Sequence, residues 1–157
     1  SLVLFMLRRT HLALGLAIGL YFVSHIKSNK WAFLAIVLIS SVLPDIESGF
    51  SAPKRHRLLS FQQTKWVFHR NFLIHTYTIL IPLTIVFTFF YPTMAFPFFL
   101  GYSFHLFLDT FSPQGIRPFW PLKGKSTGSI VPGGRIDKVL FYVFVIFDFA
   151  LLVKLFI

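Results

Sequence analysis

Two ionisable residues, His105 and Asp109, stand four positions apart within an apolar segment of the chain. On an α-helix this spacing places both side chains on one face, one turn apart. Ionisable side chains inside an apolar run of membrane length are costly, and their default interpretation is functional. The pair is therefore a candidate for metal binding, with an interhelical hydrogen-bonded pair as the structural alternative.

Any metal site in this chain must be built from imidazole and carboxylate groups, because there is no cysteine. Such a donor set suits zinc, iron or manganese. A catalytic ion keeps one coordination position open for water and lowers the pKa of that water. The chain has six histidines and five acidic residues, so the candidates are few. Besides His105 and Asp109, those near the ends of apolar runs are His11, Asp45, Glu47, His69 and His75.

The composition predicts that these residues are positioned by an all-α integral membrane protein. Hydrophobic residues make up 55% of the 157 positions, 22 of them are Phe, and the mean hydropathy is +0.73. Soluble domains average about 45–50% apolar residues even when glycine is counted. The apolar residues form blocks without strand alternation, which predicts one membrane-embedded helical bundle over residues 1–157. Its five apolar runs cover about residues 12–26, 31–43, 71–91, 94–111 and 139–157.

The first apolar run carries two helix signals. Thr10 stands just before it and is expected to be the N-cap. Gly15 and Gly19 form a small-xxx-small pattern, which lets another helix approach closely. The runs 12–26 and 31–43 are short for a membrane span of about 20 residues, so they are expected to tilt or to pack against longer helices.

The placement of the basic residues predicts the orientation of the bundle. If the five runs alternate, one side receives the N-terminus and the loops 44–70 and 112–138, with all but three of the 15 Lys and Arg residues. The positive-inside rule makes that side cytoplasmic, so we expect a protein of the inner or plasma membrane with its N-terminus in the cytoplasm and its C-terminus outside. The basic loops are expected to attract anionic lipid headgroups. The net charge of +10 also leaves nucleic acid as a partner to consider, although no nucleic-acid-binding fold is recognisable.

This topology brings the candidate ligands to one membrane surface. Four histidines and up to three carboxylates would meet there, enough for one or two ions. Each has a structural alternative as a capping, core or solvated loop residue. Arg70 and Arg117 either serve as headgroup and topology charges or clamp a substrate phosphate. Asp148, alone within the last run, is interpreted as structural.

Several short motifs lie between about residues 10 and 122. They are Thr10-His11 with Gly15, Leu43-Pro44-Asp45-Ile46-Glu47, His69-Arg70 with His75, Gly101-Tyr102-Ser103-x-His105-Leu106-x-Leu108-Asp109, Pro113-x-Gly115 and Phe119-Trp120-Pro121. In this order they resemble the YdjM-like family of membrane-bound metal-dependent hydrolases. That family is distantly similar to zinc-dependent phospholipases C and single-strand nucleases, which are all-helical enzymes with clustered His and Asp ligands.

The resemblance implies a ligand set and a chemistry. It implies one or two zinc ions, with manganese or iron as alternatives, and hydrolysis of a phosphoester. The ligands that it implies are His11, Asp45, His69, His75, His105 and Asp109.

Two positions depart from the family pattern. Glu47 stands where the family usually has Asp. His69 and His75 are six residues apart, whereas the family usually spaces them by five. On one helix a separation of six leaves the two side chains roughly 120° apart, so both can bind only if His69 precedes the helix.

The sequence therefore predicts a membrane-bound hydrolase that acts on a phosphoester, such as that of a lipid, at the cytoplasmic interface. Glu47 or Asp45 would shuttle the proton. One alternative is a non-catalytic membrane binding or regulatory protein with a structural metal or none. Another is a small transporter, which should place its ionisable groups near the bilayer midplane. Because the candidates other than Asp148 gather at one end, the transporter is the less favoured alternative.

Overall fold

A computed structural model describes residues 2–27, 29–50 and 74–157. Within these residues the regular secondary structure is helical, apart from an isolated bridge between Ile116 and Ser126. The all-α prediction with five helices is therefore confirmed for this part of the chain. The helices are α1 (Leu2–Val23), α2 (Lys30–Phe50), α4 (Tyr77–Phe90), α5 (Pro92–Asp109) and α6 (Arg135–Phe156).

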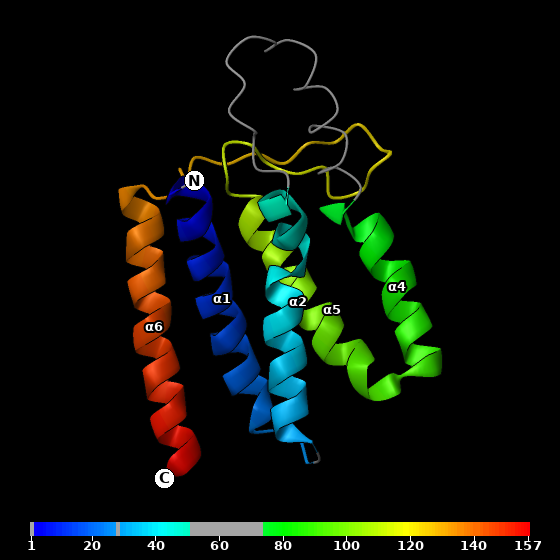
Figure 1. The fold of residues 1–157 in the computed structure, drawn as a ribbon, viewed down its shortest axis with the longest axis vertical. Helices are drawn as coiled ribbons and strands as arrows, with labels where there is room; N and C mark the ends of the chain where they lie inside the picture. The colour runs from blue at the N-terminus through cyan, green and yellow to red at the C-terminus, as the bar shows by residue number, and fades with distance from the viewer. Residues whose placement is uncertain (1, 28, 51–73) are drawn as a thin grey trace.

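Successive helices run in opposite directions (Figure 1). The starts of α1, α4 and α6 therefore lie at the same end of the bundle as the ends of α2 and α5, and we call this the site end. The helix α1 packs against α6, α2 and α5, while α5 also packs against α2 and α4. The topology thus brings to one end the four helix termini near which the sequence placed its candidates, together with the start of α6.

Glycines set the spacing between α1, α2 and α5. A Cβ added at Gly15 would lie 2.5 Å from Ser41 Oγ, and one at Gly19 would lie 2.6 Å from the nearest side-chain atom of α2. The predicted close approach to another helix is therefore confirmed, with α2 as the partner. At Gly101 an added Cβ would lie 2.3 Å from the backbone oxygen of Val37. Because that neighbour is backbone, no side-chain rotation could make room.

Two helices begin or end beyond the apolar runs at the site end. The helix α2 continues through Pro44 and Asp45 to Phe50, so the predicted loop 44–70 starts too early. The helix α6 begins at Arg135, inside the predicted loop 112–138. Polar residues can extend a helix past its apolar part, so hydropathy marks the apolar part rather than the helix ends.

Thr10 does not begin a helix. It lies within α1, which starts at Leu2, and its hydroxyl donates a hydrogen bond to Asp137 Oδ1 at 2.7 Å. The prediction that Thr10 is an N-cap is therefore wrong. Because Asp137 lies in the first turn of α6, this hydrogen bond links α1 to α6.

The connection between α5 and α6 is held by backbone hydrogen bonds. Ile116 and Ser126 exchange two of them, each at 2.9 Å. Ile116 is buried in the apolar cluster between α4 and α5, which also contains Leu80, Tyr102 and Leu106. These contacts attach the connection to the site end.

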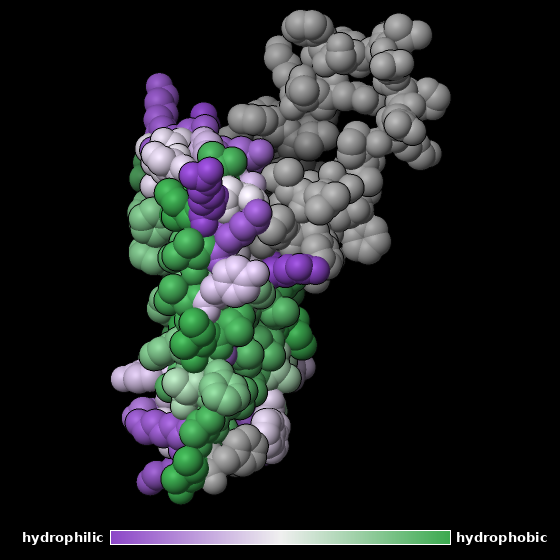
Figure 2. All heavy atoms as spheres, turned by 90° about the vertical axis from the view of Figure 1, so that its left-hand side faces the viewer, coloured by the Kyte–Doolittle hydropathy of each residue, from purple (hydrophilic) through white to green (hydrophobic). Residues whose placement is uncertain are grey.

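Large hydrophobic side chains face outward along α4, α5 and α6. Figure 2 shows hydrophobic residues along the middle of the face over α6 and hydrophilic residues toward the ends of the bundle. Exposed examples are Ile85, Phe89, Phe96, Tyr142, Ile146 and Phe149. Among the residues that the structure describes, no helix combines the length and apolarity needed to cross a membrane.

Candidate metal centre

Asp109, the last residue of α5, lies among three imidazole rings. Its Oδ1 is 3.2 Å from His11 Nε2, and its Oδ2 is 3.4 Å from His75 Nε2 and 3.3 Å from His105 Nε2. The rings come from α1, from the residues just before α4, and from α5 itself. Three separate segments therefore each direct an imidazole Nε2 atom at one carboxylate.

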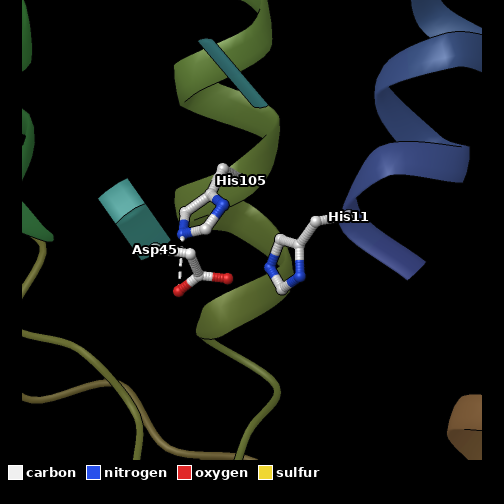
Figure 3. A group of neighbouring side chains, drawn as sticks. All are labelled: His11, Asp45 and His105. Atoms are coloured by element: carbon white, nitrogen blue, oxygen red, sulfur yellow. Dashed lines mark ion pairs between the residues drawn. The ribbon is translucent and has the colours of Figure 1, made fainter. Parts of the chain in front are cut away.

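Asp45 approaches the same group from α2. Its Oδ1 lies 3.9 Å from His75 Nε2 and 4.0 Å from His105 Nε2. Figure 3 shows His11, Asp45 and His105 directed toward one another from α1, α2 and α5. Potential ligand atoms lie within 4.8 Å of one another in two sets of three, His11 with Asp45 and His105, and His75 with His105 and Asp109.

A backbone carbonyl fixes the tautomer of His105. Its Nδ1 lies 2.8 Å from the carbonyl oxygen of Ser41. A carbonyl can only accept, so Nδ1 carries a proton, and the tautomer of the ring that can bind a metal has its lone pair on Nε2. This Nε2 is buried, has no hydrogen-bond partner among the described residues, and lies 3.3 Å from Asp109 Oδ2. Metal-binding histidines commonly show this arrangement, with the second ring nitrogen held by a carbonyl or carboxylate.

The local sequence of α2 and α5 explains why His105 reaches Ser41. The contact of Gly101 with Val37 brings the two backbones together one turn before His105.

The distances to Asp109 fit ion coordination better than ion pairing. Charge-assisted N–H···O bonds are typically about 2.7–2.9 Å long. Ligand atoms about 2.0–2.2 Å from a tetrahedral zinc ion lie about 3.3–3.5 Å from one another. The three separations of 3.2, 3.3 and 3.4 Å fall close to the second range. The donor set of imidazole nitrogens and carboxylate oxygens also suits zinc, so the residues present fit such an ion.

The centre is sealed on one side and accessible on the other. The side chains of His11 and His105 are 1% and 0% exposed. Those of His75, Asp45 and Asp109 are 13%, 15% and 14% exposed. Solvent therefore reaches the cluster along the edge formed by the second group.

Asp45 is ionised in this environment. Burial acts to raise the pKa of its carboxyl group, but the His75 imidazole and the charges of His105 and His11 outweigh that effect. The neighbouring Asp109 charge acts against them. The net result is a pKa below the usual value of 3.8, so Asp45 is a carboxylate at neutral pH.

His75 lies just before α4 and not within a helix. Thr76, the N-cap of α4, is fully buried and donates its hydroxyl hydrogen to the Pro118 carbonyl oxygen at 2.8 Å. On the other side of His75, the carbonyl of Ile74 accepts a 2.6 Å hydrogen bond from the Tyr102 hydroxyl. Anchors on both neighbours therefore fix His75. The expectation that run 71–91 places His75 on a helix is wrong, and the angular argument from its spacing to His69 does not apply.

The other predicted site residues are not placed in the cluster. His69 and Arg70 lie outside the described residues, as does the side chain of Glu47, whose backbone is within α2. Arg117 lies beside Pro118 in the connection to α6 and is half-buried. Its role toward a substrate remains a prediction.

Four residues that the sequence reasoning did not assign support the centre. They are Ser41, Thr76, Tyr102 and Asp137. Thr76 next to His75 and Tyr102 inside an apolar run carried a polar side chain as a signal. Ser41 acts through its backbone carbonyl and Asp137 lies in the predicted loop 112–138, so no local signal marked these two.

Comparison with known proteins gave one match. A family model described as YdjM inner membrane protein matches residues 6–155. Neither the curated proteins nor the solved structures include a match to the chain.

Proposed function

The chain belongs to the YdjM inner membrane protein family, and from this premise we propose that it is a membrane-bound, metal-dependent hydrolase of phosphoesters. One observation carries the proposal. Three imidazole Nε2 atoms lie 3.2, 3.3 and 3.4 Å from the oxygens of the Asp109 carboxylate. A cluster of this kind, open on one edge, provides metal ligands together with access for a substrate.

The proposed centre holds one zinc ion, with manganese or iron as alternatives. His105 belongs to both sets of potential ligands. Its Nδ1 is bound to the Ser41 carbonyl, so only Nε2 is available. One lone pair cannot serve two ions, which favours a single ion shared by His11, Asp45, His75, His105 and Asp109.

Carboxylate and guanidinium groups of the chain supply the remaining chemistry. When bound, a zinc ion supplies Lewis-acid chemistry that polarises a phosphoryl oxygen and acidifies water. Asp45, ionised and partly exposed, accepts the proton that water loses as its oxygen bonds to phosphorus, and Glu47 is the alternative acceptor. The ester P–O bond breaks, and the leaving oxygen takes up the proton that Asp45 had accepted, which returns Asp45 to its carboxylate form. Arg117, with Arg70, binds the non-bridging phosphate oxygens.

We assign the site end to the cytoplasmic surface of the inner membrane. Support comes from the family, from the outward hydrophobic side chains of α4, α5 and α6, and from the basic residues near the site end. The helices would be embedded in the bilayer, with the N-terminus in the cytoplasm and the C-terminus outside. A phosphoester of a lipid with an anionic headgroup would then lie at the depth of the centre.

The proposal is tested on purified protein in a non-ionic detergent. The substrates are bis(p-nitrophenyl) phosphate, a short-chain phospholipid and single-stranded DNA, each with zinc or with a chelator. The account predicts zinc-dependent hydrolysis of the first two, loss in Asp109→Asn, and retention in Asp148→Asn. Zinc-independent hydrolysis, or equal activity in both variants, would contradict it. Cleavage of DNA instead would identify nucleic acid as the substrate.

A structural metal is the second candidate. Five potential donors could fill the coordination sphere of one ion, and His11 and His105 are almost completely buried. Structural zinc sites have four protein ligands and no open position. Stoichiometric zinc with no hydrolysis of any phosphoester would favour this candidate, and Asp109→Asn would then lower thermal stability without affecting an activity.

A further inference from the structure

Asp137 is a buried carboxylate on a helix that gives no ligand to the centre among the described residues. It lies in the first turn of α6 and is 4% exposed. Its Oδ1 accepts the Thr10 hydroxyl at 2.7 Å, and its Oδ2 accepts the backbone N–H of Gly133 at 2.9 Å. A buried carboxylate that receives two hydrogen bonds is a strong local anchor.

Thr10 directly precedes His11 on α1, and both are buried, at 3% and 2% exposure. Consecutive residues of an α-helix point about 100° apart. Thr10 is thus directed at α6 through Asp137, while His11 is directed at Asp109 on α5. The bond to Asp137 therefore fixes the rotation of α1 at the turn from which His11 extends.

A small cavity lies beside this bond, so side-chain packing is not the only constraint on the position of His11. It has a volume of about 20 Å³, enough for about one water molecule. Thr10, His11, Ser112 and Asp137 contribute its polar lining. Side chains therefore leave free space next to His11, and the hydrogen bond between Thr10 and Asp137 joins two of the residues that line it.

We propose that Asp137 is a positioning residue for His11. Through Thr10 it holds α1 so that His11 Nε2 stays within coordinating distance of the Asp109 group, and α6 serves as a support for the centre. The inference rests on the proposed metal site but needs no catalytic activity. Loss of outer hydrogen-bonding partners of metal ligands typically lowers metal affinity about 10–100-fold.

Zinc affinity, measured by chelator competition on detergent-purified protein, tests the inference. We expect Asp137→Ala and Thr10→Val each to weaken zinc binding about 10–100-fold while one ion still binds at saturation. The double variant should be no weaker than the single ones, because both remove one connection. Thr10→Ser keeps the hydroxyl and should bind within about threefold of wild type.

The matched control is Asp148→Asn. Asp148 is a second buried acid on the same helix, 5% exposed, and lies three turns further along α6. It should leave zinc affinity unchanged. Cobalt substitution adds a spectroscopic readout, because a displaced His11 should alter the visible absorption of the Co²⁺ complex in Asp137→Ala and not in Asp148→Asn.

Failure of the inference can be told apart from failure of the metal site. If His11→Ala weakens zinc binding while Asp137→Ala and Thr10→Val match wild type, the centre stands and the positioning role is overturned. Equal weakening by Asp148→Asn, or additive effects of Thr10→Val and Asp137→Ala, would also overturn it. If wild type binds no zinc, both proposals fall. If Asp137→Ala does not fold, the comparison of Thr10→Val with Thr10→Ser decides.

Discussion

Asp109 and Asp148 are two acidic residues of this bundle that have little solvent exposure and different surroundings. Asp109 ends α5 and lies within 3.4 Å of imidazole nitrogens from three segments. Asp148 lies in the middle of α6, and its Oδ1 is buried without a hydrogen-bond partner among the described residues. Low solvent exposure is common to both, so the exposure of an acid alone does not identify the site. The difference is that several helix ends meet at Asp109.

The comparison predicts its largest effect for the exchange of carboxylate for amide. Asp109→Asn keeps the shape of the side chain but removes a charge that faces three imidazoles, so zinc content should fall from about one ion per chain to near zero. Asp148→Asn makes the same chemical change elsewhere and should keep full zinc content. Elemental analysis of both purified variants is the measurement. Similar zinc loss in both would remove the distinction between the two regions.

A second prediction concerns the backbone contact that supports the site. In Gly101→Ala the new Cβ would meet the Val37 oxygen at 2.3 Å and separate α5 from α2. Overpacking of this kind costs about 1–3 kcal/mol, so Tm should fall by several degrees and zinc affinity should weaken, because His105 moves away from Ser41. Thermal unfolding and chelator competition measure the two effects.

The matched control for this change is Gly124→Ala. An added Cβ at Gly124 has no heavy atom within 4 Å, so this variant should keep the wild-type Tm and zinc affinity. An unchanged Tm for Gly101→Ala would mean that α2 and α5 can separate without cost, and the account of how His105 is positioned would be wrong.

A smaller effect is expected within the cluster itself. Asp45 lies 3.9 and 4.0 Å from the nearest imidazole nitrogens, further than Asp109. Asp45→Asn should therefore weaken zinc binding about tenfold and not abolish it, because the donors around Asp109 remain. Competition titrations on Asp45→Asn and Asp109→Asn compare the two acids directly. A greater loss in Asp45→Asn would reverse their assigned importance.

The smallest effect is expected from a mild change of pH. Imidazole binds a metal only when neutral, and unperturbed imidazole takes up a proton near about pH 6.5. Lowering the pH from 7.5 to 6.5 should weaken zinc binding a few-fold, with a steeper loss below. Folding lowers the pKa of Asp45, so the carboxylate stabilises the folded state at pH values above its unfolded-state pKa. This stability is lost as the pH falls through the folded-state pKa, which lies below 3.8. Constant affinity down to pH 5 would argue against imidazole ligands.

Much of the fold could be predicted because apolar blocks and helical spacing are local signals. The spacing of His105 and Asp109 places both on one face of α5, where they lie 3.3 Å apart. Gly15 and Gly19 mark the approach of α2. Alternation of the helices then brings the candidate residues to one end, as expected for apolar runs that cross a bilayer in alternating directions.

The remaining features depend on contacts between distant segments. Thr10 has the residue type of an N-cap, yet its partner is Asp137, 127 positions away. Run 71–91 suggests a helix that includes His75, but the hydrogen bond from Thr76 to Pro118 places the helix start later. Tertiary hydrogen bonds override local propensity at such places, and no spacing rule within one segment reveals them.

X-ray absorption spectroscopy of the zinc-loaded wild-type protein tests the central claim most directly. The account predicts one zinc ion per chain with nitrogen and oxygen ligands at about 2.0–2.2 Å and outer-shell scattering from about three imidazole rings. Asp148→Asn should give the same spectrum. A zinc environment without imidazole scattering, or protein that holds no stoichiometric metal, would contradict the account.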